Sequence, residues 1–353
     1  NKANQNDLEG KIYRYIQNTF SSEQLKQEIK ENFPEKEVSR RNNGYALDFL
    51  IDSPNPNLAK LYAGSEGTLG FATEFKLNLV SLPPKHKAVI CVHFSELKDS
   101  FTGNLIALRH SPMAVELMDN NIIEAAYRNP TQKQNTFFIE DEPKAILIIE
   151  FAEESEEKLQ AKLQETISDF KENSSAYAFP IIYNEKISRV WELRKAGLGL
   201  LTNVAGDYKP VSVIEDTAVA PKRLPSYLSE FEDVLSTYNL KCVYHAHIAT
   251  GELHLRPILN LKKKEDVERF YNLSKDVALL VKKHRGSLSG EHGDGRLRGE
   301  WIPLMYGEKI YGLMKEMKSI WDEENVFNRG KIIDTPKMNT SLRYEGIKAQ
   351  NIS

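Results

Sequence analysis

The sequence predicts an α+β protein built on an antiparallel sheet. Between residues 85 and 240, apolar stretches of strand length alternate with amphipathic stretches of helix length, and the connections between them are unequal. Unequal connections favour an antiparallel sheet over a doubly wound parallel one. Near the C-terminus, histidines and carboxylates gather in two glycine-punctuated segments, 247–254 and 290–295. We therefore expect the rest of the chain to hold or surround a site built from these two segments.

The composition is that of a soluble globular protein with two or three domains. The 353 residues are 41% hydrophobic and 27% charged, with a net charge of −3, which gives no reason to expect nucleic-acid binding. No apolar run approaches the roughly 20 residues that span a bilayer. Cys91 and Cys242 are far apart in apolar stretches, so we expect two buried free thiols and a cytoplasmic location, with association at the cytoplasmic face of a membrane as an alternative.

The first 84 residues contain a predicted helix and two polar turns. Residues 22–33 predict a helix with Ser22 as its N-cap. The turn at residues 40–45 carries two arginines, and its basic groups would either receive a phosphate or lie in a solvated loop. The glycine-rich stretch 64–70 either contacts a cofactor through exposed backbone N–H groups or is an ordinary turn. It is followed by alternating residues that predict a strand over 75–80.

Pro83-Pro84 marks a domain boundary, and the next region supplies most of the predicted sheet. Its alternating and apolar stretches predict strands over Ala88–Phe94, Ala114–Met118, Ala145–Phe151 and Val211–Val219. Its amphipathic stretches predict helices over 96–109 and Glu153–Lys171. Further on, the same patterns predict helices over Lys262–Arg285 and Tyr306–Asn325, a strand over Gly286–Ser289 and a turn over 328–332.

Two cations within this region are candidates for binding an anion. Arg194 follows Trp191 in an amphipathic stretch, and its guanidinium could hold a carboxylate through two parallel hydrogen bonds. Lys209 precedes Pro210 and the strand predicted after it. The alternative for both residues is an ordinary surface position.

His247, His254 and Glu291 form a candidate metal site. Gly251 and the flanking strand-like residues predict a strand-turn-strand that brings the two histidines together. Two imidazoles and a carboxylate suit Zn²⁺ with open positions, and Mn²⁺ or Fe²⁺ would also accept them. His292 is a candidate general base, because in an extended chain it would point away from Glu291. His245 shares the face of His247 and is kept as a spare ligand; the alternative for all of these histidines is a set of satisfied core residues.

A series of motifs resembles one known family. In order, they are Gly64-Ser65-Glu66-Gly67-Thr68-Leu69-Gly70, Ala114–Asp119, Trp191-x-x-Arg194, Glu215-Asp216-x-Ala218-Val219, His247-x6-His254, Gly290–Gly295 and Gly330-Lys331. Together they resemble the FAD-linked 2-hydroxy-acid dehydrogenases of the vanillyl-alcohol-oxidase type, the group of D-lactate, glycolate and D-2-hydroxyglutarate dehydrogenases. The resemblance covers about residues 20–345. The tail, from Met338 to Leu342-Arg343-Tyr344, most resembles large members that continue into an iron–sulfur domain.

The resemblance implies an organisation in three parts. Residues 1–84 would be the C-terminal part of a PCMH-type FAD-binding domain. Residues 85–289 would be a substrate or cap domain with a ferredoxin-like antiparallel sheet and helices on one face. Residues 290–353 would return to the flavin and end in the tail.

The resemblance also implies roles for individual residues. The residues expected to line the flavin are Gly64, Ser65, Glu66, Gly67, Thr68, Gly70 and Lys331. A divalent metal would be bound by His247, His254 and Glu291. Arg194 and Lys209 would hold the carboxylate of a D-2-hydroxy acid, and His292 would take its hydroxyl proton while a hydride passes to FAD.

Three departures from the family pattern limit these expectations. Thr250 and Glu252 replace the usual Asp and Asn between the metal histidines, which leaves the substrate open. The electron acceptor is not indicated by the sequence. The glycine-rich pyrophosphate loop of the first flavin-binding half is absent, and two cysteines cannot hold the iron–sulfur cluster, which would belong to a missing domain. We therefore expect a middle fragment that is inactive by itself and does not retain FAD, with exposed strand edges that favour a homodimer.

Two other kinds of function are compatible with the same residues. A metal-dependent hydrolase would use the same histidines and carboxylate with water as the nucleophile, and without flavin. A non-catalytic binding module would leave the metal site empty. Flavin absorbance in the intact protein distinguishes the first of these from the dehydrogenase.

Overall fold

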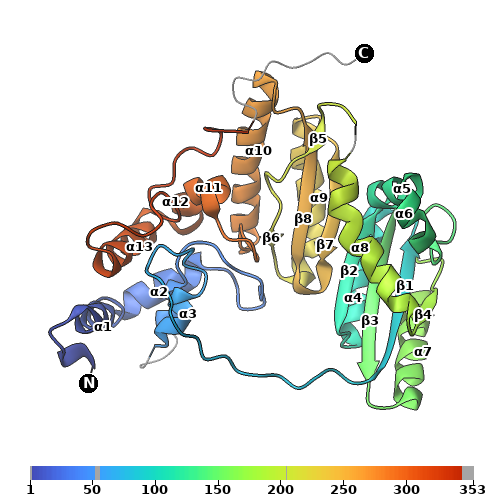
Figure 1. The fold of residues 1–353 in the computed structure, drawn as a ribbon, viewed down its shortest axis with the longest axis horizontal. Helices are drawn as coiled ribbons and strands as arrows, with labels where there is room; N and C mark the ends of the chain where they lie inside the picture. The colour runs from blue at the N-terminus through green and yellow to red at the C-terminus, as the bar shows by residue number, and fades with distance from the viewer. Residues whose placement is uncertain (1, 52–55, 204, 344–353) are drawn as a thin grey trace. The chain divides into compact units, whose positions relative to one another are not determined.

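The computed structural model describes residues 2–51, 56–203 and 205–343 (Figure 1). These residues form two compact units, which are described separately here. Unit 1 contains residues up to Leu77, the short segment Asp216–Ala218 and residues Ser274–Arg343. Unit 2 contains residues 78–215 and 219–273. The predicted boundary at residue 84 lies a few residues beyond the first division, and the last division falls within one helix, α10. Tyr344, the end of the tail motif, lies outside the described residues.

Unit 2 contains an antiparallel sheet. Its strands follow the order β4-β1-β3-β2-β7-β8-β5. Their bounds are β1 His86–Phe94, β2 Ala114–Asp119, β3 Ala145–Glu153, β4 Ile181–Tyr183, β5 Lys209–Pro210, β7 Cys242–His247 and β8 Glu252–Leu259. The helices of unit 2 are α4 Leu97–Arg109, α5 Asn120–Arg128, α6 Pro130–Lys133, α7 Glu156–Asn173, α8 Lys186–Thr202 and α9 Leu224–Thr237, with 3-10 turns η3 Gln134–Thr136, η4 Pro221–Arg223 and η5 Ile248–Thr250. The predicted antiparallel α+β architecture is confirmed.

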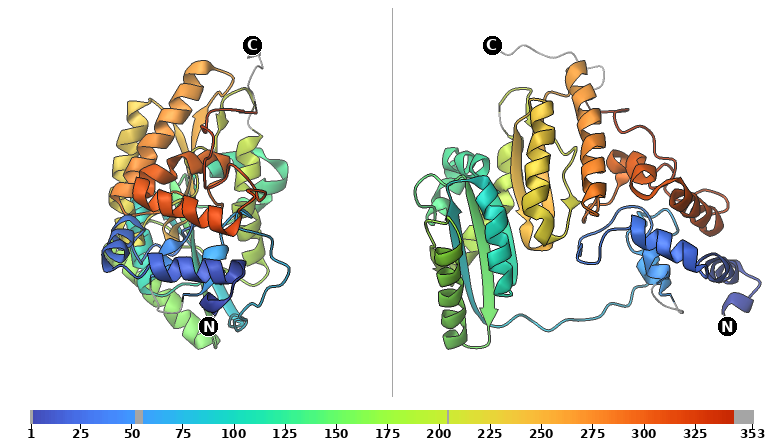
Figure 2. Two further views of the ribbon diagram at one scale, coloured as in Figure 1. Left: turned by 90° about the vertical axis from the view of Figure 1, so that its left-hand side faces the viewer. Right: turned by 180° about the vertical axis from the view of Figure 1, so that it is seen from behind.

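Helices cover both faces of this sheet, where the sequence predicted one. Five successive residues of β3, Ala145–Ile149, are fully buried, so neither face of the central strand meets water. On one face, a cluster of buried residues joins the sheet to α5 and α8, for instance Cys91 and Ile148 to Val190. On the other face, the ring of Phe94 packs edge-on against that of Phe170 from α7. In Figure 1, α8 crosses the strands, and Figure 2 shows the helices of the opposite layer.

Unit 1 is largely helical. Its elements are η1 Lys2–Asn4, α1 Leu8–Thr19, α2 Glu23–Asn32, η2 Leu47–Leu50, α3 Leu58–Tyr62, β6 Thr217–Ala218, the C-terminal part of α10 Lys264–Lys283, α11 Gly295–Arg298, η6 Gly299–Trp301, α12 Ile302–Tyr306 and α13 Glu308–Trp321. The predicted N-cap of α2 is confirmed, because the Ser22 side chain accepts a hydrogen bond from the Leu25 N–H.

The two ends of the chain pack together in unit 1. The rings of Phe33 and Tyr306 lie 4.6 Å apart, and the Tyr306 hydroxyl donates to the Asn43 carbonyl at 2.7 Å. The Lys318 ammonium of α13 donates to the Thr68 carbonyl, also at 2.7 Å. The core of unit 1 is therefore made by segments that are far apart in sequence. No helix in the described part of the chain has the length and apolar character needed to cross a membrane.

Three predicted strands are wrong, and each fails for a physical reason. Residues 75–80 form no strand; Phe75, Leu77 and Leu79 are 70%, 82% and 95% exposed, and a strand requires a neighbour for its backbone hydrogen bonds. Of the strand predicted over 211–219 only β6, Thr217–Ala218, forms, because Asp216 just before it adopts a φ of +82°. Over 286–289 only Ser287 forms a strand-type bridge, to Ala218.

Gly251 provides a test of the turn between β7 and β8. Its φ is +78°, and a Cβ atom there would lie 1.8 Å from the Val219 carbonyl oxygen. We expect Gly251→Ala to destabilise the protein by at least about 2 kcal/mol, because left-handed backbone strain adds to the clash. Urea unfolding measures this. Gly199→Ala is the control: Gly199 lies in α8 with open space around it, and alanine there should stabilise by up to about 1 kcal/mol. Equal free energies of unfolding for the two variants would contradict the expectation.

Candidate functional site

Three histidines project from the paired strands β7 and β8 of unit 2. The register places His245 opposite His254 and His247 opposite Glu252, so these side chains share one face of the sheet. The ring centroids of His247 and His254 are 5.1 Å apart, and those of His245 and His254 are 4.8 Å apart. The predicted strand-turn-strand and the convergence of its two histidines are confirmed, with η5 as the turn.

The imidazole of His245 is available as a neutral ligand. The side chain is buried, and burial lowers its pKa well below the ordinary value, with the electrostatic influence of His254 and Arg194 acting in the same direction. Among the residues that the structure describes, neither ring nitrogen of His245 has a hydrogen-bond partner. A neutral imidazole is the form that binds metals. The paired strands β7 and β8 therefore offer three imidazoles to a metal, and His245 is the additional candidate ligand that the sequence suggested.

Glu116 connects His247 to Arg194. Its Oε1 lies 2.7 Å from the Nδ1 of His247, and its Oε2 lies 2.8 Å from Nη2 of Arg194. Both carboxylate and guanidinium are largely buried, with 12% and 13% of their side chains exposed. A carboxylate on Nδ1 fixes the imidazole tautomer that leaves Nε2 for a ligand. Glu116 was part of a recognised motif but received no role; the signal was an acidic residue in an otherwise apolar strand.

A second buried ion pair lies in unit 2. Arg256, two residues beyond His254 on β8, pairs with Glu215 and donates from Nη1 to the Ser212 hydroxyl at 3.0 Å. Burial lowers the pKa of Arg256, and the Glu215 carboxylate opposes that effect. Sequence reasoning assigned no role to Arg256. Lys209, the second predicted carboxylate-binding residue, lies in β5 opposite Leu259 of β8.

Glu291 and His292 lie in unit 1, on the loop Gly290–Gly295. Glu291 Oε2 accepts a hydrogen bond from Arg40 at 2.7 Å, and its Oε1 lies 3.2 Å from the Nε2 of His292. The extended chain predicted for this segment, in which these two side chains point apart, is wrong, because residues 290–292 bend and Gly293 and Gly295 have positive φ. The general-base role of His292 stays a prediction.

The predicted metal ligands are divided between the two units. His247 and His254 belong to unit 2, and their proximity is a property of that unit. Glu291 belongs to unit 1. The structure therefore brings together two of the three predicted ligands, and the participation of Glu291 stays a prediction.

The glycine-rich loop 64–70 is stabilised by hydrogen bonds within the loop, and it also forms hydrogen bonds to the loop Gly290–Gly295. Ser65 and Thr68 are buried, and the Thr68 hydroxyl donates to the Ser65 carbonyl at 2.6 Å. Glu66 accepts hydrogen bonds from the N–H groups of Asp294 at 2.6 Å and Gly295 at 3.1 Å. These three side chains are therefore occupied within unit 1.

The glycines of this loop suit close approach by a ligand. Gly64 has a φ of +81°, and a Cβ there would lie 2.2 Å from the Asn42 side-chain oxygen. Gly67 has a φ of +66°, and nothing lies within 4 Å of a Cβ built there. Backbone atoms are thus exposed at the position where the resemblance places the flavin. Lys331 lines a separate cavity of about 440 Å³ in unit 1, beside Arg329.

Asp294, in the loop Gly290–Gly295, forms hydrogen bonds to the turn that precedes η2. Its Oδ2 accepts the Gly44 N–H at 2.6 Å, and its Oδ1 accepts from the Asn43 amide. Burial raises the pKa of Asp294 to about 7, and the nearby Glu66 carboxylate acts in the same direction, while the hydrogen bonds from Gly44 and Asn43 oppose it.

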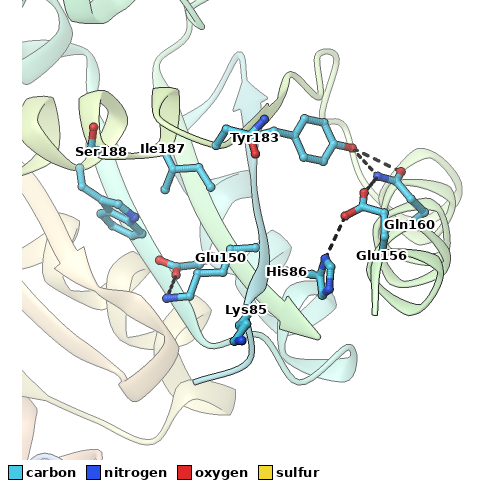
Figure 3. A pocket seen from close by; sticks show the side chains of 11 residues that line it. Lys85, His86, Glu150, Glu156, Gln160, Tyr183, Ile187 and Ser188 are labelled. Atoms are coloured by element: carbon cyan, nitrogen blue, oxygen red, sulfur yellow. Dashed lines mark hydrogen bonds and ion pairs between the residues drawn. The ribbon is translucent and has the colours of Figure 1, made fainter. Parts of the chain in front are cut away.

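A cavity of about 1040 Å³ lies at the edge of the sheet in unit 2 (Figure 3). Its charged side chains pair with one another: His86 with Glu156 at 3.4 Å and Lys87 with Glu150 at 3.5 Å. Of the motif residues, Trp191 lines it. None of the predicted catalytic, flavin or metal residues is among its lining residues, so it is not part of the candidate site.

The Glu116 bridge can be tested by unfolding. We expect Glu116→Ala to cost about 3 kcal/mol of unfolding free energy, because it leaves Arg194 buried without its carboxylate. Glu124→Ala is the control, since Glu124 pairs with Arg128 on an exposed helix surface and should cost less than about 0.5 kcal/mol. A loss no larger than that of the control, measured by urea titration, would show that the bridge contributes little.

Comparisons with known proteins identify the family. A model described as "FAD linked oxidases, C-terminal domain" matches residues 83–332. The chain is 30% identical over 331 residues to the D-2-hydroxyglutarate dehydrogenase of Pseudomonas putida, covering 92% of this chain and 32% of that protein. It is 24% identical over 284 residues to the glycolate oxidase subunit GlcD of Bacillus subtilis, covering 78% and 57%. The chain thus spans about a third of the length of the first relative and just over half of the second.

Among solved structures, the chain resembles 4-ethylphenol oxidase from Gulosibacter chungangensis, with a TM-score of 0.50 and 9% identity, covering 71% of this chain and 54% of that one. At this identity the likeness is one of fold alone. The family match covers most of the chain, including the sheet of unit 2, and it confirms the resemblance drawn from the motifs. The protein belongs to the family of FAD linked oxidases, of which it contains the C-terminal domain.

Proposed function

We propose that this chain is part of a flavin-dependent enzyme that oxidises a D-2-hydroxy acid to the corresponding 2-oxo acid. The observation that carries the proposal is the linked group of His247, Glu116 and Arg194 beside two further histidines, in the C-terminal domain of an FAD linked oxidase. A site with a fixed guanidinium and several imidazoles suits a small anionic substrate that must also lose a proton. The names of the relatives, D-2-hydroxyglutarate dehydrogenase and glycolate oxidase subunit, support the same class of substrate.

Arg194 is proposed to bind the carboxylate of the substrate. Its Nη2 is held by Glu116, while its Nε makes no hydrogen bond within the described residues. A buried donor without a partner is costly, and a bound carboxylate would remove that cost. Lys209 is proposed as a second cation for the same group. Because Glu116 fixes the guanidinium, the carboxylate would be oriented before reaction, which reduces the entropic cost of reaching the reactive geometry.

A divalent metal fits the donor set of β7 and β8. His247 and His254 offer nitrogen ligands from adjacent strands, and Glu116 holds His247 in the tautomer that a metal needs. We propose His247, His254 and Glu291 as the ligands, with zinc as the first expectation and manganese or iron(II) as alternatives. The chemistry that such a metal supplies when bound is polarisation of the hydroxyl oxygen, which makes its proton easier to remove.

His292 is proposed to take the hydroxyl proton of the substrate. The chemistry that FAD supplies when bound is acceptance of the hydride from the α-carbon, so that the C–H and O–H bonds break and a C=O bond forms. The glycines of the loop 64–70 are proposed to contact the flavin through their backbone, and Lys331 through its ammonium. We do not expect this chain alone to retain FAD, because a dinucleotide also requires a dense array of donors around its phosphates.

The metal ligands are tested by cation binding to this chain. We expect about one divalent ion to bind, and His254→Ala to lower the affinity for Zn²⁺ or Mn²⁺ by at least about tenfold, since one of three ligands is lost. Isothermal titration measures the affinity. His110→Ala is the control, because His110 is bound to Asp169 on another part of unit 2 and its loss should leave cation affinity unchanged. Equal affinities for both variants would remove His254 from the metal site.

The role of Arg194 is tested in the full-length enzyme loaded with FAD. We expect Arg194→Lys to raise KM and to lower kcat/KM for D-2-hydroxy acids by roughly 10- to 100-fold, because the fork of two hydrogen bonds is lost, at about 1.5–3 kcal/mol. Arg128→Lys, on an exposed helix surface, serves as the control and should keep the parental values. Unchanged kcat/KM in Arg194→Lys would rule out its contact with the substrate carboxylate, and absence of any hydroxy-acid oxidation would refute the proposed activity.

A further inference from the structure

Asp216 holds the backbone of the loop that carries Glu291 and His292. Its Oδ1 accepts the Glu291 N–H at 3.0 Å, and its Oδ2 accepts the His292 N–H, also at 3.0 Å. Its Oδ2 also accepts the Ser289 hydroxyl at 2.6 Å, and its main-chain carbonyl accepts the Gly290 N–H at 2.7 Å. One residue therefore binds four consecutive residues, 289–292, through both its side chain and its backbone.

The conformation of Asp216 is maintained by these contacts. The residue is fully buried and has a φ of +82°, a region that non-glycine residues rarely adopt, although Asp and Asn tolerate it best. The adjoining β6 bridges to Ser287 through two backbone hydrogen bonds at 2.8 and 2.9 Å. A buried carboxylate needs such a set of donors to offset the loss of water. The segment 216–218 is thus built around its contact with residues 287–292.

The two hydrogen bonds to successive N–H groups fix the backbone on both sides of Glu291. With both peptide planes held, the Cα–Cβ bond of Glu291 and the position of the His292 Cα are set. In this arrangement the Glu291 carboxylate and the His292 imidazole lie 3.2 Å apart, where an extended chain would separate them. Asp216, Glu291 and His292 each place one ligand-type atom within 4.8 Å of the others.

We propose that Asp216 is the positioning residue for Glu291 and His292. Its carboxylate does not bind substrate; it orients the peptide that presents the metal-binding carboxylate and the base. This inference rests on the proposed function for the roles of those two residues. The hydrogen bonds from their N–H groups to Asp216 are observed within unit 1. The motif containing Glu215 and Asp216 was recognised in the sequence, but the proposed mechanism assigned it no role.

The chain contains a matched control for this inference. Asp322 is also buried in unit 1, and it also accepts two successive backbone N–H groups, from Val326 and Phe327, both at 2.9 Å. Its loop carries neither a proposed metal ligand nor the proposed base. Asp322 also pairs with the buried Lys318 ammonium, so Asp322→Asn measures the cost of losing such hydrogen bonds together with that ion pair, without the loss of orientation at Glu291.

The experiment compares Asp216→Asn with Asp322→Asn in the complete chain. Asparagine keeps the volume and tolerates the positive φ, but it turns one acceptor into a donor that faces an N–H group. The affinity for Zn²⁺ or Mn²⁺ is measured by isothermal titration, and amide hydrogen exchange is followed in peptides covering residues 289–293 and 325–328. Thermal unfolding shows that each variant is folded at the temperature used.

We expect Asp216→Asn to lower cation affinity by at least about tenfold and to increase exchange in residues 289–293 by a similar factor. We expect Asp322→Asn to increase exchange in residues 325–328, with cation affinity within about twofold of the parent. Equal cation affinity for Asp216→Asn and the parent would overturn the inference.

The inference and the proposed function can fail separately. If the parent chain binds no divalent ion, the proposed metal site fails. The positioning role is then decided by hydrogen exchange together with the NMR contact between the side chains of Glu291 and His292, which lie 3.2 Å apart. Unchanged exchange in residues 289–293 or an unchanged NMR contact in Asp216→Asn would overturn it. Faster exchange with loss of this contact, in a variant as stable as Asp322→Asn, would uphold it.

Discussion

Carboxylates that accept backbone N–H groups are the interaction on which unit 1 depends. Asp216 and Asp294, which are buried, and Glu66, which is partly buried, each bind main-chain donors of a segment distant in sequence. Removing a carboxylate from water is unfavourable unless several donors replace that water, and each of these three has at least two. Because the donors belong to peptide groups, the same bonds fix the path of the loop Gly290–Gly295. The stability of this unit and the geometry of its candidate site therefore come from the same contacts.

In unit 2, the register between strands places the polar side chains of the candidate site. In an antiparallel pair, residues opposite each other share a face, so the pairing of His245 with His254 determines that three imidazoles meet. A slip of one residue would move them to the opposite face, where Tyr244 of β7 packs against Phe231 of α9. Glu116 then compensates the buried Arg194 and directs His247 at the same time. The polar group thus lies on two paired strands of a sheet whose strand β3 is apolar and buried on both faces over Ala145–Ile149.

Several features of the chain were accessible from local sequence patterns. The strands β1, β2 and β3 and the helices α2, α4, α7, α10 and α13 lie where the apolar periodicity predicted them, within a few residues. Periodicity predicts such elements well because burial of one face is decided by residues close together in the chain. The turn at Gly251 brought its two histidines together for the same reason, because only six residues separate them. The motifs in order were enough to identify the family.

Only the tertiary structure decided the contacts between residues that are far apart in sequence. Glu116 and His247 are 131 residues apart, and Asp216 and Glu291 are 75 apart, so no local pattern connects them. The wrong strand over 75–80 has the same origin, because alternation shows which side chains could share a face but does not supply a partner strand. The sequence by itself determined the helices α2, α4, α7, α10 and α13, the strands β1, β2 and β3, the turn between β7 and β8, and the candidate chemical groups. The tertiary structure decided which backbone and side-chain partners hold those groups, because hydrogen bonds and buried charges depend on distance in space rather than distance along the chain.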